Sequence, residues 1–325
     1  TAGNNQWTIS NNLENGALFT VNGNFTNLEN GGTAATQTIS IRGYGSTVWN
    51  GAITENAALG GKIAWNIALH PDAFFKMDGA SANSYTNSTT LSQGTLILSK
   101  NSGVSQFGTT SVFAFNGGVL TTDGGFDLTG VNAIATPITL GGDPATINGT
   151  NSFELTAATA LSLAASRVLV NNLSGGASLT ITGNISNTAA STLTVYGSGN
   201  TTLNGIYAAG TGANGLTMSG TGTFTSTGAN TATGALTANR GTISLSGANG
   251  AWATTGNTFT LNANGTLQLN NSVSNNNNRM LDGGAITFAG GTLSLVGNGA
   301  VATTETVGAA TMNNIMSTVN VSGDA

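Results

Sequence analysis

An internal repeat constrains the fold of this chain more than any other feature of its sequence. Residues 7–27 align without gaps on residues 167–187, and they share Asn-Asn-Leu, Gly-Ala and Gly-Asn at matching positions. Residues 43–51 then match residues 197–205 through a common Gly-x-Gly-x-Thr-x-x-Asn-Gly, at an offset six residues shorter. The repeat predicts two related modules, residues 1–160 and 161–325.

The local pattern of both modules predicts short β-strands. Segments such as 37–41, 178–182 and 292–295 alternate apolar residues with Thr or Ser, which is typical of strands with one buried face. Gly-rich and Asn-rich turns interrupt these segments every ~8 to 12 residues. The chain is therefore predicted to be all-β with low helix content.

The drift in the repeat offset favours a β-solenoid over a closed sandwich. In a solenoid each coil contacts mainly its neighbours, so a loop can gain or lose residues without disturbing distant coils. We predict a parallel β-helix in which the second module is a diverged copy of the first, stacked on it coaxially. The residues predicted to point into the core each have Thr or Ser beside them: Ile181, Leu193, Leu236, Ile243, Leu261, Ile286 and Leu293.

One stretch in each module resembles a known repeat. Asn83-x-Tyr85 followed by Gly94-Thr-Leu96 is similar to the autotransporter-associated β-strand repeat, and a second copy runs from Asn230 to Gly241-Thr-Ile243. The second copy has Ala232 in place of the aromatic residue. The resemblance implies a large secreted bacterial protein of the passenger type, with a right-handed parallel β-helix and no defined catalytic residues. It places the chain outside the cell or on the bacterial surface.

The charge content excludes several partners. The chain has seven Lys and Arg against 12 Asp and Glu, and the basic residues are spread along its whole length. Phosphate-backbone binding needs several of them on one face, so nucleic acid is not an expected partner. No window reaches the ~20 apolar residues of a membrane-spanning helix, and we predict no membrane insertion.

The sequence offers few groups for catalysis. The single His70 lies in a His-Pro-Asp segment with Asp72, and Asp78 follows nearby. Such residues could bind a metal, but a turn is the favoured interpretation. Asp123 and Asp127 flank a Gly-Gly-Phe segment and are assigned to a turn in the same way. There is no Cys. We therefore predict no catalytic, cofactor-binding or metal-binding residues, no cofactor and no enzymatic activity.

Three classes of function were compared. A structural role, as a subunit or segment of a surface fibre, filament or stalk in a biofilm, is favoured. The alternative is an adhesin that binds glycans or neighbouring cells through aromatic residues expected to be exposed, Tyr44, Trp49 and Tyr85. A polysaccharide-active enzyme is disfavoured because acids and bases are scarce. Nine Asn-x-Ser/Thr triplets are candidate glycosylation sites: Asn24, Asn87, Asn148, Asn172, Asn184, Asn200, Asn264, Asn270 and Asn320.

The two ends of the chain have no recognisable cap. Trp7 and Ile9 already belong to the repeat, and residues 317–321 are predicted to form another strand. Two explanations are compatible with this pattern. Either the chain is an excerpt of a longer solenoid, or copies associate end to end through their terminal strands. We favour end-to-end association, because a surface with few charges offers little repulsion against stacking.

Overall fold

The computed structural model describes residues 6–14, 16–27, 36–55, 61–108, 112–123 and 125–323. Their regular structure is almost entirely parallel β-sheet, wound as a β-solenoid. The one helical element among the described residues is a short 3-10 turn, Gly130–Asn132. The predicted all-β solenoid with low helix content is confirmed. No helix in the described ranges has the length and apolar character needed to cross a bilayer.

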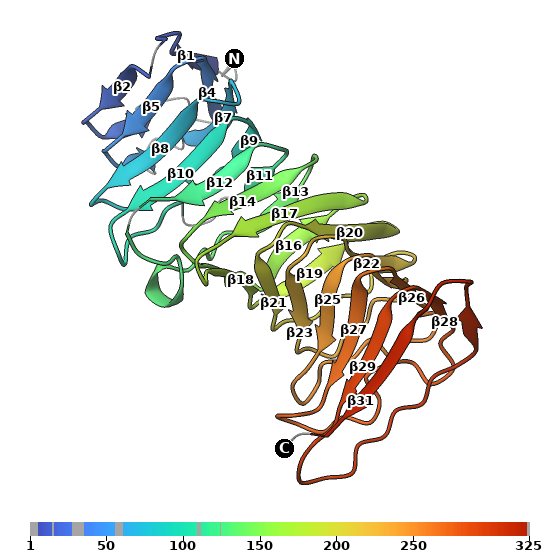
Figure 1. Ribbon diagram of the computed structural model, residues 1–325. Helices are drawn as coiled ribbons and strands as arrows, with labels where there is room; N and C mark the ends of the chain where they lie inside the picture. The colour runs from blue at the N-terminus through green and yellow to red at the C-terminus, as the bar shows by residue number, and fades with distance from the viewer. Residues whose placement is uncertain are drawn as a thin grey trace. The chain divides into compact units, whose positions relative to one another are not determined.

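The chain divides into two compact units, Thr1–Ala157 and Ala158–Ala325. The coaxial stacking of two modules stays a prediction. Each unit forms its sheets from strands that return to the same side once per coil, and Figure 1 shows these strands side by side. The coil length varies: 20 residues separate Leu216 from its partner Leu236, whereas 28 separate Leu18 from Ser46.

Unit 1 has two sheets of six strands and a smaller pair. The first sheet contains, in order, β1 (Gln6–Ser10), β4 (Thr36–Gly43), β7 (Lys62–Leu69), β9 (Thr89–Gln93), β11 (Phe113–Phe115) and β13 (Ile138–Leu140). The second contains β2 (Leu18–Val21), β5 (Ser46–Trp49), β8 (Phe74–Gly79), β10 (Thr95–Lys100), β12 (Val119–Thr122) and β14 (Ala145–Gly149). The pair is β3 (Phe25–Asn27) with β6 (Ile53–Glu55), and β15 (Phe153–Leu155) bridges to Leu128 and Ile134.

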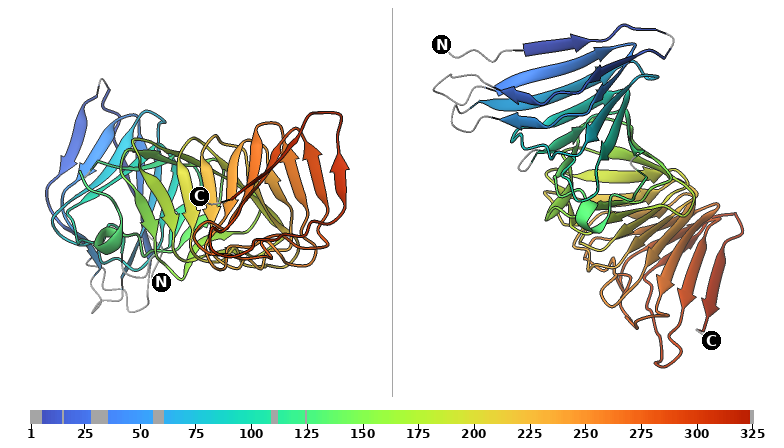
Figure 2. Two further views of the ribbon diagram at one scale, coloured as in Figure 1. Left: turned by 60° about the horizontal axis from the view of Figure 1, so that its bottom comes forward. Right: turned by 90° about the vertical axis from the view of Figure 1, so that its left-hand side faces the viewer.

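Unit 2 has the same plan, and Figure 2 shows its successive coils with strand beside strand. One sheet contains β17 (Arg167–Leu173), β20 (Ser191–Tyr196), β22 (Asn214–Met218), β24 (Leu236–Ala238), β26 (Phe259–Asn262), β28 (Ile286–Ala289) and β30 (Ala310–Met312). A second contains β18 (Ser178–Ile181), β21 (Asn200–Leu203), β23 (Thr223–Ser226), β25 (Gly241–Leu245), β27 (Gly265–Asn270), β29 (Thr292–Val296) and β31 (Thr318–Ser322). The remaining pair is β16 (Thr159–Leu163) with β19 (Asn184–Asn187).

The core is built from columns of apolar side chains in register. In unit 2 one column runs through Leu193, Leu216, Leu236, Phe259 and Ile286, each paired with the next. Alternation sends every second residue inward, and pairing in register places those residues above one another. All seven residues predicted to face the core are buried, so that prediction is confirmed.

Two basic residues, Lys100 and Arg279, are completely buried. The Lys100 Nζ donates to the carbonyls of Gly51 and Asp78 at 3.0 and 2.8 Å. The Arg279 guanidinium donates to the Asn271 side chain and to three backbone carbonyls, at 2.6 to 2.9 Å. Buried charges are tolerated when their donors are satisfied in this way. The local sequence does not indicate this burial, because Lys and Arg side chains are mostly exposed in folded proteins.

Candidate functional sites at a corner and at the end coils

The duplicated residues build the same corner in both units. Asn171 is fully buried; its Nδ2 donates to the Asn200 carbonyl at 2.9 Å, and its Oδ1 accepts from the Leu173 N–H at 3.1 Å. In unit 1, Asn11 donates to the Ser46 carbonyl at 2.7 Å and accepts from the Leu13 N–H at 3.0 Å. Equivalent residues of the repeat therefore occupy equivalent corners.

Glycine is required next to these asparagines. Gly43 and Gly197 have φ of 110° and 96°, a region that residues with a side chain rarely adopt. A Cβ at either position would overlap the carbonyl of the corner asparagine in the neighbouring coil. The Gly-x-Gly of the repeat thus lets one coil lie directly against the next.

In unit 1 three successive turns lie against one another at this corner. The Gly45 N–H donates to the Asn11 carbonyl at 2.8 Å, and the His70 N–H donates to the Gly43 carbonyl at 2.9 Å. Tyr44 lies between Gly43 and Gly45, the two residues of its turn that make these bonds. Its backbone and that of His70 are therefore held by the coil-to-coil hydrogen bonds.

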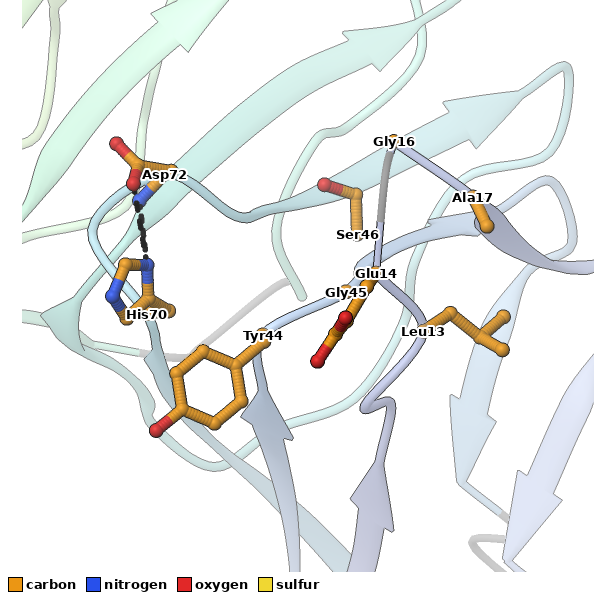
Figure 3. Close-up of a pocket in the computed structure, with 9 residues that line it drawn as sticks. All are labelled: Leu13, Glu14, Gly16, Ala17, Tyr44, Gly45, Ser46, His70 and Asp72. Carbon is orange, nitrogen blue, oxygen red and sulfur yellow. Dashed lines mark hydrogen bonds and ion pairs between the residues drawn. The ribbon is translucent and has the colours of Figure 1, made fainter.

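The three turns surround a hollow of about 380 Å³, shown in Figure 3. Its lining residues come from the turn after β1, the turn between β4 and β5, and the turn between β7 and β8: Leu13, Glu14, Gly16, Ala17, Tyr44, Gly45, Ser46, His70 and Asp72. A hollow of this size is in the range that holds a small ligand. It is the candidate binding site of unit 1.

The hollow combines an aromatic surface with polar groups. Tyr44 is 67% exposed, and its ring centroid lies 5.0 Å from that of His70. The His70 Nδ1 lies 3.5 Å from a carboxylate oxygen of Asp72, the contact drawn in Figure 3. The Ser46 hydroxyl accepts from the Phe74 N–H at 3.1 Å and keeps its own proton to donate. The site can therefore offer a ring face, hydrogen-bond acceptors and a donor to one ligand.

Of the three aromatic residues that were expected to be exposed, only one is exposed in the structure. Tyr44 is exposed as predicted, whereas the expectation is wrong for Trp49 and Tyr85, which are 5% and 0% exposed. Trp49 packs edge-on against Trp65 with ring centroids 5.7 Å apart. The Tyr85 hydroxyl bonds Thr89 at 2.6 Å, and burial raises the pKa of Tyr85. Neither side chain can reach a ligand outside the solenoid.

The nine candidate glycosylation sites all have at least partly exposed side chains: Asn24, Asn87, Asn148, Asn172, Asn184, Asn200, Asn264, Asn270 and Asn320. At least six of them also make side-chain hydrogen bonds: Asn24, Asn87, Asn148, Asn184, Asn200 and Asn270. The Oδ1 of Asn24 accepts from the Ala52 N–H at 2.8 Å, and that of Asn184 accepts from the Ile206 N–H at 3.0 Å. Their modification stays a prediction.

The other acidic residues considered for chemistry do not join the hollow. Asp78 and Asp123 both contact the Lys76 ammonium, at 2.8 and 3.1 Å. Asp127 accepts from the Ser152 N–H at 2.6 Å. Within the described part of the chain, no three His, Cys, Asp or Glu side chains are grouped closely enough to hold a metal ion.

The end coils form a second candidate site, because among the described residues the core columns continue into them without a further strand against them. At one extreme of unit 1, Phe19 pairs with the buried Thr47 but is itself 42% exposed. At one extreme of unit 2, Val321 pairs with Leu295 and is 69% exposed. The outer edges of β1, β2, β30 and β31 have no strand partner among the described residues.

Comparison with known proteins adds no relative: no family model, no curated protein and no solved structure matches this chain.

Proposed function

We propose that this protein is a structural β-solenoid of the bacterial cell surface, and that copies associate end to end to form a fibre, filament or stalk. The observation that carries the proposal is the exposure, among the described residues, of apolar side chains in the outermost coils, such as Phe19 and Val321. An uncovered strand edge above an apolar stripe is a template for a further strand.

The strand directions fit a head-to-tail junction. All named strand pairs within the units are parallel, for example β2 with β5 and β29 with β31. A second copy placed head to tail continues this direction, so its end coil can add to the edge by the same parallel hydrogen bonding. Such contacts are heterologous and produce an open filament when the rotation between copies does not close a ring.

The chemistry of the end coils also suits burial. Met312 and Val321 are exposed in strands that contain no charged residue, and β2 likewise has none. Removing apolar area from water contributes roughly 25 cal/mol per Å², and no buried charge opposes it here. The resemblance to exported passenger-type repeats supports a location outside the cell.

The test uses two neighbouring residues of β31 that face opposite sides. Val321 continues the column of Leu269 and Leu295, whereas the exposed Asn320 alternates with it and pairs with Ser294. We expect the wild-type chain to form filaments as its concentration rises, measured by sedimentation velocity and electron microscopy. Val321→Lys should remain monomeric, because it places an unpaired charge in the junction. Asn320→Lys is the matched control and should assemble like the wild type.

Two results would contradict the proposal. The first is a wild-type chain that stays monomeric at millimolar concentration. The second is assembly of Val321→Lys to the same extent as Asn320→Lys. The location is tested separately, by labelling intact cells with an antibody against the chain, and labelling only after lysis would refute a surface position.

A further inference from the structure

The corner hollow of unit 1 is a saccharide-binding site for a neutral sugar, we infer, with Tyr44 as its stacking platform. A pyranose has one face of C–H groups and a rim of hydroxyls. The hollow matches both, since the exposed Tyr44 ring supplies a flat apolar surface and polar groups surround it. Figure 3 shows Tyr44 between the His70–Asp72 pair and Glu14.

The polar groups determine the class of sugar. Glu14 and Asp72 line the hollow with carboxylates, which accept hydrogen bonds from sugar hydroxyls, and Ser46 adds a hydroxyl. The lining contains no Lys or Arg. An acidic sugar would therefore meet two carboxylates without a permanent countercharge, which disfavours uronic or sialic acids. A neutral hexose or pentose unit fits this electrostatic environment.

The second copy of the corner shows that these side chains are not needed for the fold. In unit 2 the Thr221 N–H donates to the Gly197 carbonyl at 2.8 Å, just as the His70 N–H donates to the Gly43 carbonyl. By the repeat alignment, Ser198 occupies the position of Tyr44. Unit 2 thus builds the same corner with small polar residues. The aromatic pair of unit 1 is additional to what the corner requires.

The platform is also held in place before any ligand arrives. The backbone on both sides of Tyr44 is fixed by bonds to neighbouring coils, through Gly43 and Gly45. The His70 ring packs against the Tyr44 ring at an interplanar angle of 37°. A side chain ordered in advance loses less conformational entropy on binding, which favours affinity.

The experiment measures binding of neutral oligosaccharides to the full chain by saturation-transfer NMR and calorimetry. The probes are β-1,4-linked glucose and xylose oligomers and α-linked mannose oligomers, with oligogalacturonate as the acidic counterpart and spermidine as a cationic one. We expect saturable binding of at least one neutral series and weaker binding of oligogalacturonate.

Three variants separate binding from folding. Tyr44→Ser places the residue of unit 2 in unit 1 and should weaken binding at least tenfold with unchanged circular dichroism. Tyr44→Phe keeps the ring face and should bind within about threefold of the wild type. Tyr196→Ser removes an exposed tyrosine of unit 2 and is the control, with unchanged affinity expected.

The inference is overturned if no neutral series binds, if spermidine or oligogalacturonate binds more tightly, or if Tyr44→Ser binds like the wild type. Binding is counted per chain and does not require filaments. The Val321→Lys chain should therefore bind sugar normally, so that failure of the fibre proposal and failure of this one give different results.

Discussion

The corner asparagine of unit 2 allows a sharp test of how the coils are held together. Replacing Asn171 with Ala removes its bonds to the Asn200 carbonyl, the Thr201 hydroxyl and the Leu173 N–H, which measure 2.9, 3.0 and 3.1 Å. Each buried hydrogen bond contributes about 1 kcal/mol net, so the free energy of unfolding should fall by about 3 kcal/mol. The control is Asn172→Ala at the exposed neighbouring position, with a change of about 0.5 kcal/mol or less.

The assay is urea denaturation followed by tryptophan fluorescence, with hydrogen exchange to locate the effect. Trp252 is the only tryptophan of unit 2 and is fully buried beside Tyr207. Exchange protection should be lost first at the Leu173 amide, because its N–H is the backbone donor that bonds the Asn171 side chain. If Asn171→Ala unfolds at the same urea concentration as Asn172→Ala, the corner bonds do not stabilise the fold as argued.

Two further predictions concern the core. Ile243→Asp should lower the free energy of unfolding by several kcal/mol, because it buries an unpaired charge. The control Thr242→Asp, on the outward face, should change it by less than about 1 kcal/mol. Equal denaturation midpoints for the two variants would show that the assigned register is wrong. Burial lowers the pKa of Lys100 from 10.5 to about 8. Between these two values the unfolded chain binds more protons than the folded one, so Lys100 makes stability rise with pH. The stability difference between wild type and Lys100→Met should therefore shift in favour of the wild type from pH 8 to 10.5, and a difference independent of pH would contradict this burial effect.

The sequence predicted the solenoid and much of its core because both depend on local alternation. Residues such as Ile243 and Leu261 alternate with Thr or Ser. Only one of the two possible orientations of the strand turns the apolar residues toward the core. The repeat predicted more, because the shared Asn-Asn-Leu and Gly-x-Gly correspond to one set of hydrogen bonds in both units. The repeat therefore predicted that the two modules share these segments, and the structure showed that they form a corner.

The buried aromatics and the hollow were not predictable in the same way. In residues 46–49, Ser-Thr-Val-Trp, either parity places one large side chain inside, and the structure buries Thr47 and Trp49 while Val48 faces outward. Tyr85 is tolerated inside because its hydroxyl bonds the hydroxyl of Thr89, four residues later, a contact that the alternation of apolar and polar residues does not report. The hollow joins residues near positions 14, 44 and 70, which meet only because the turns of three coils coincide.

The corner asparagines also solve a problem that alternation leaves open. Because side chains alternate with a period of two, a strand displaced by two residues along its neighbour would still bury its apolar face. Such a slip moves every carbonyl by ~6.6 Å, twice the rise of a strand residue, and takes the Asn200 carbonyl out of reach of Asn171. The asparagine therefore acts as a latch against sliding. A duplication that copies whole coils copies the corner asparagine together with the glycine that packs against it, such as Asn171 with Gly197. The new coils are then held in register without any compensating mutation.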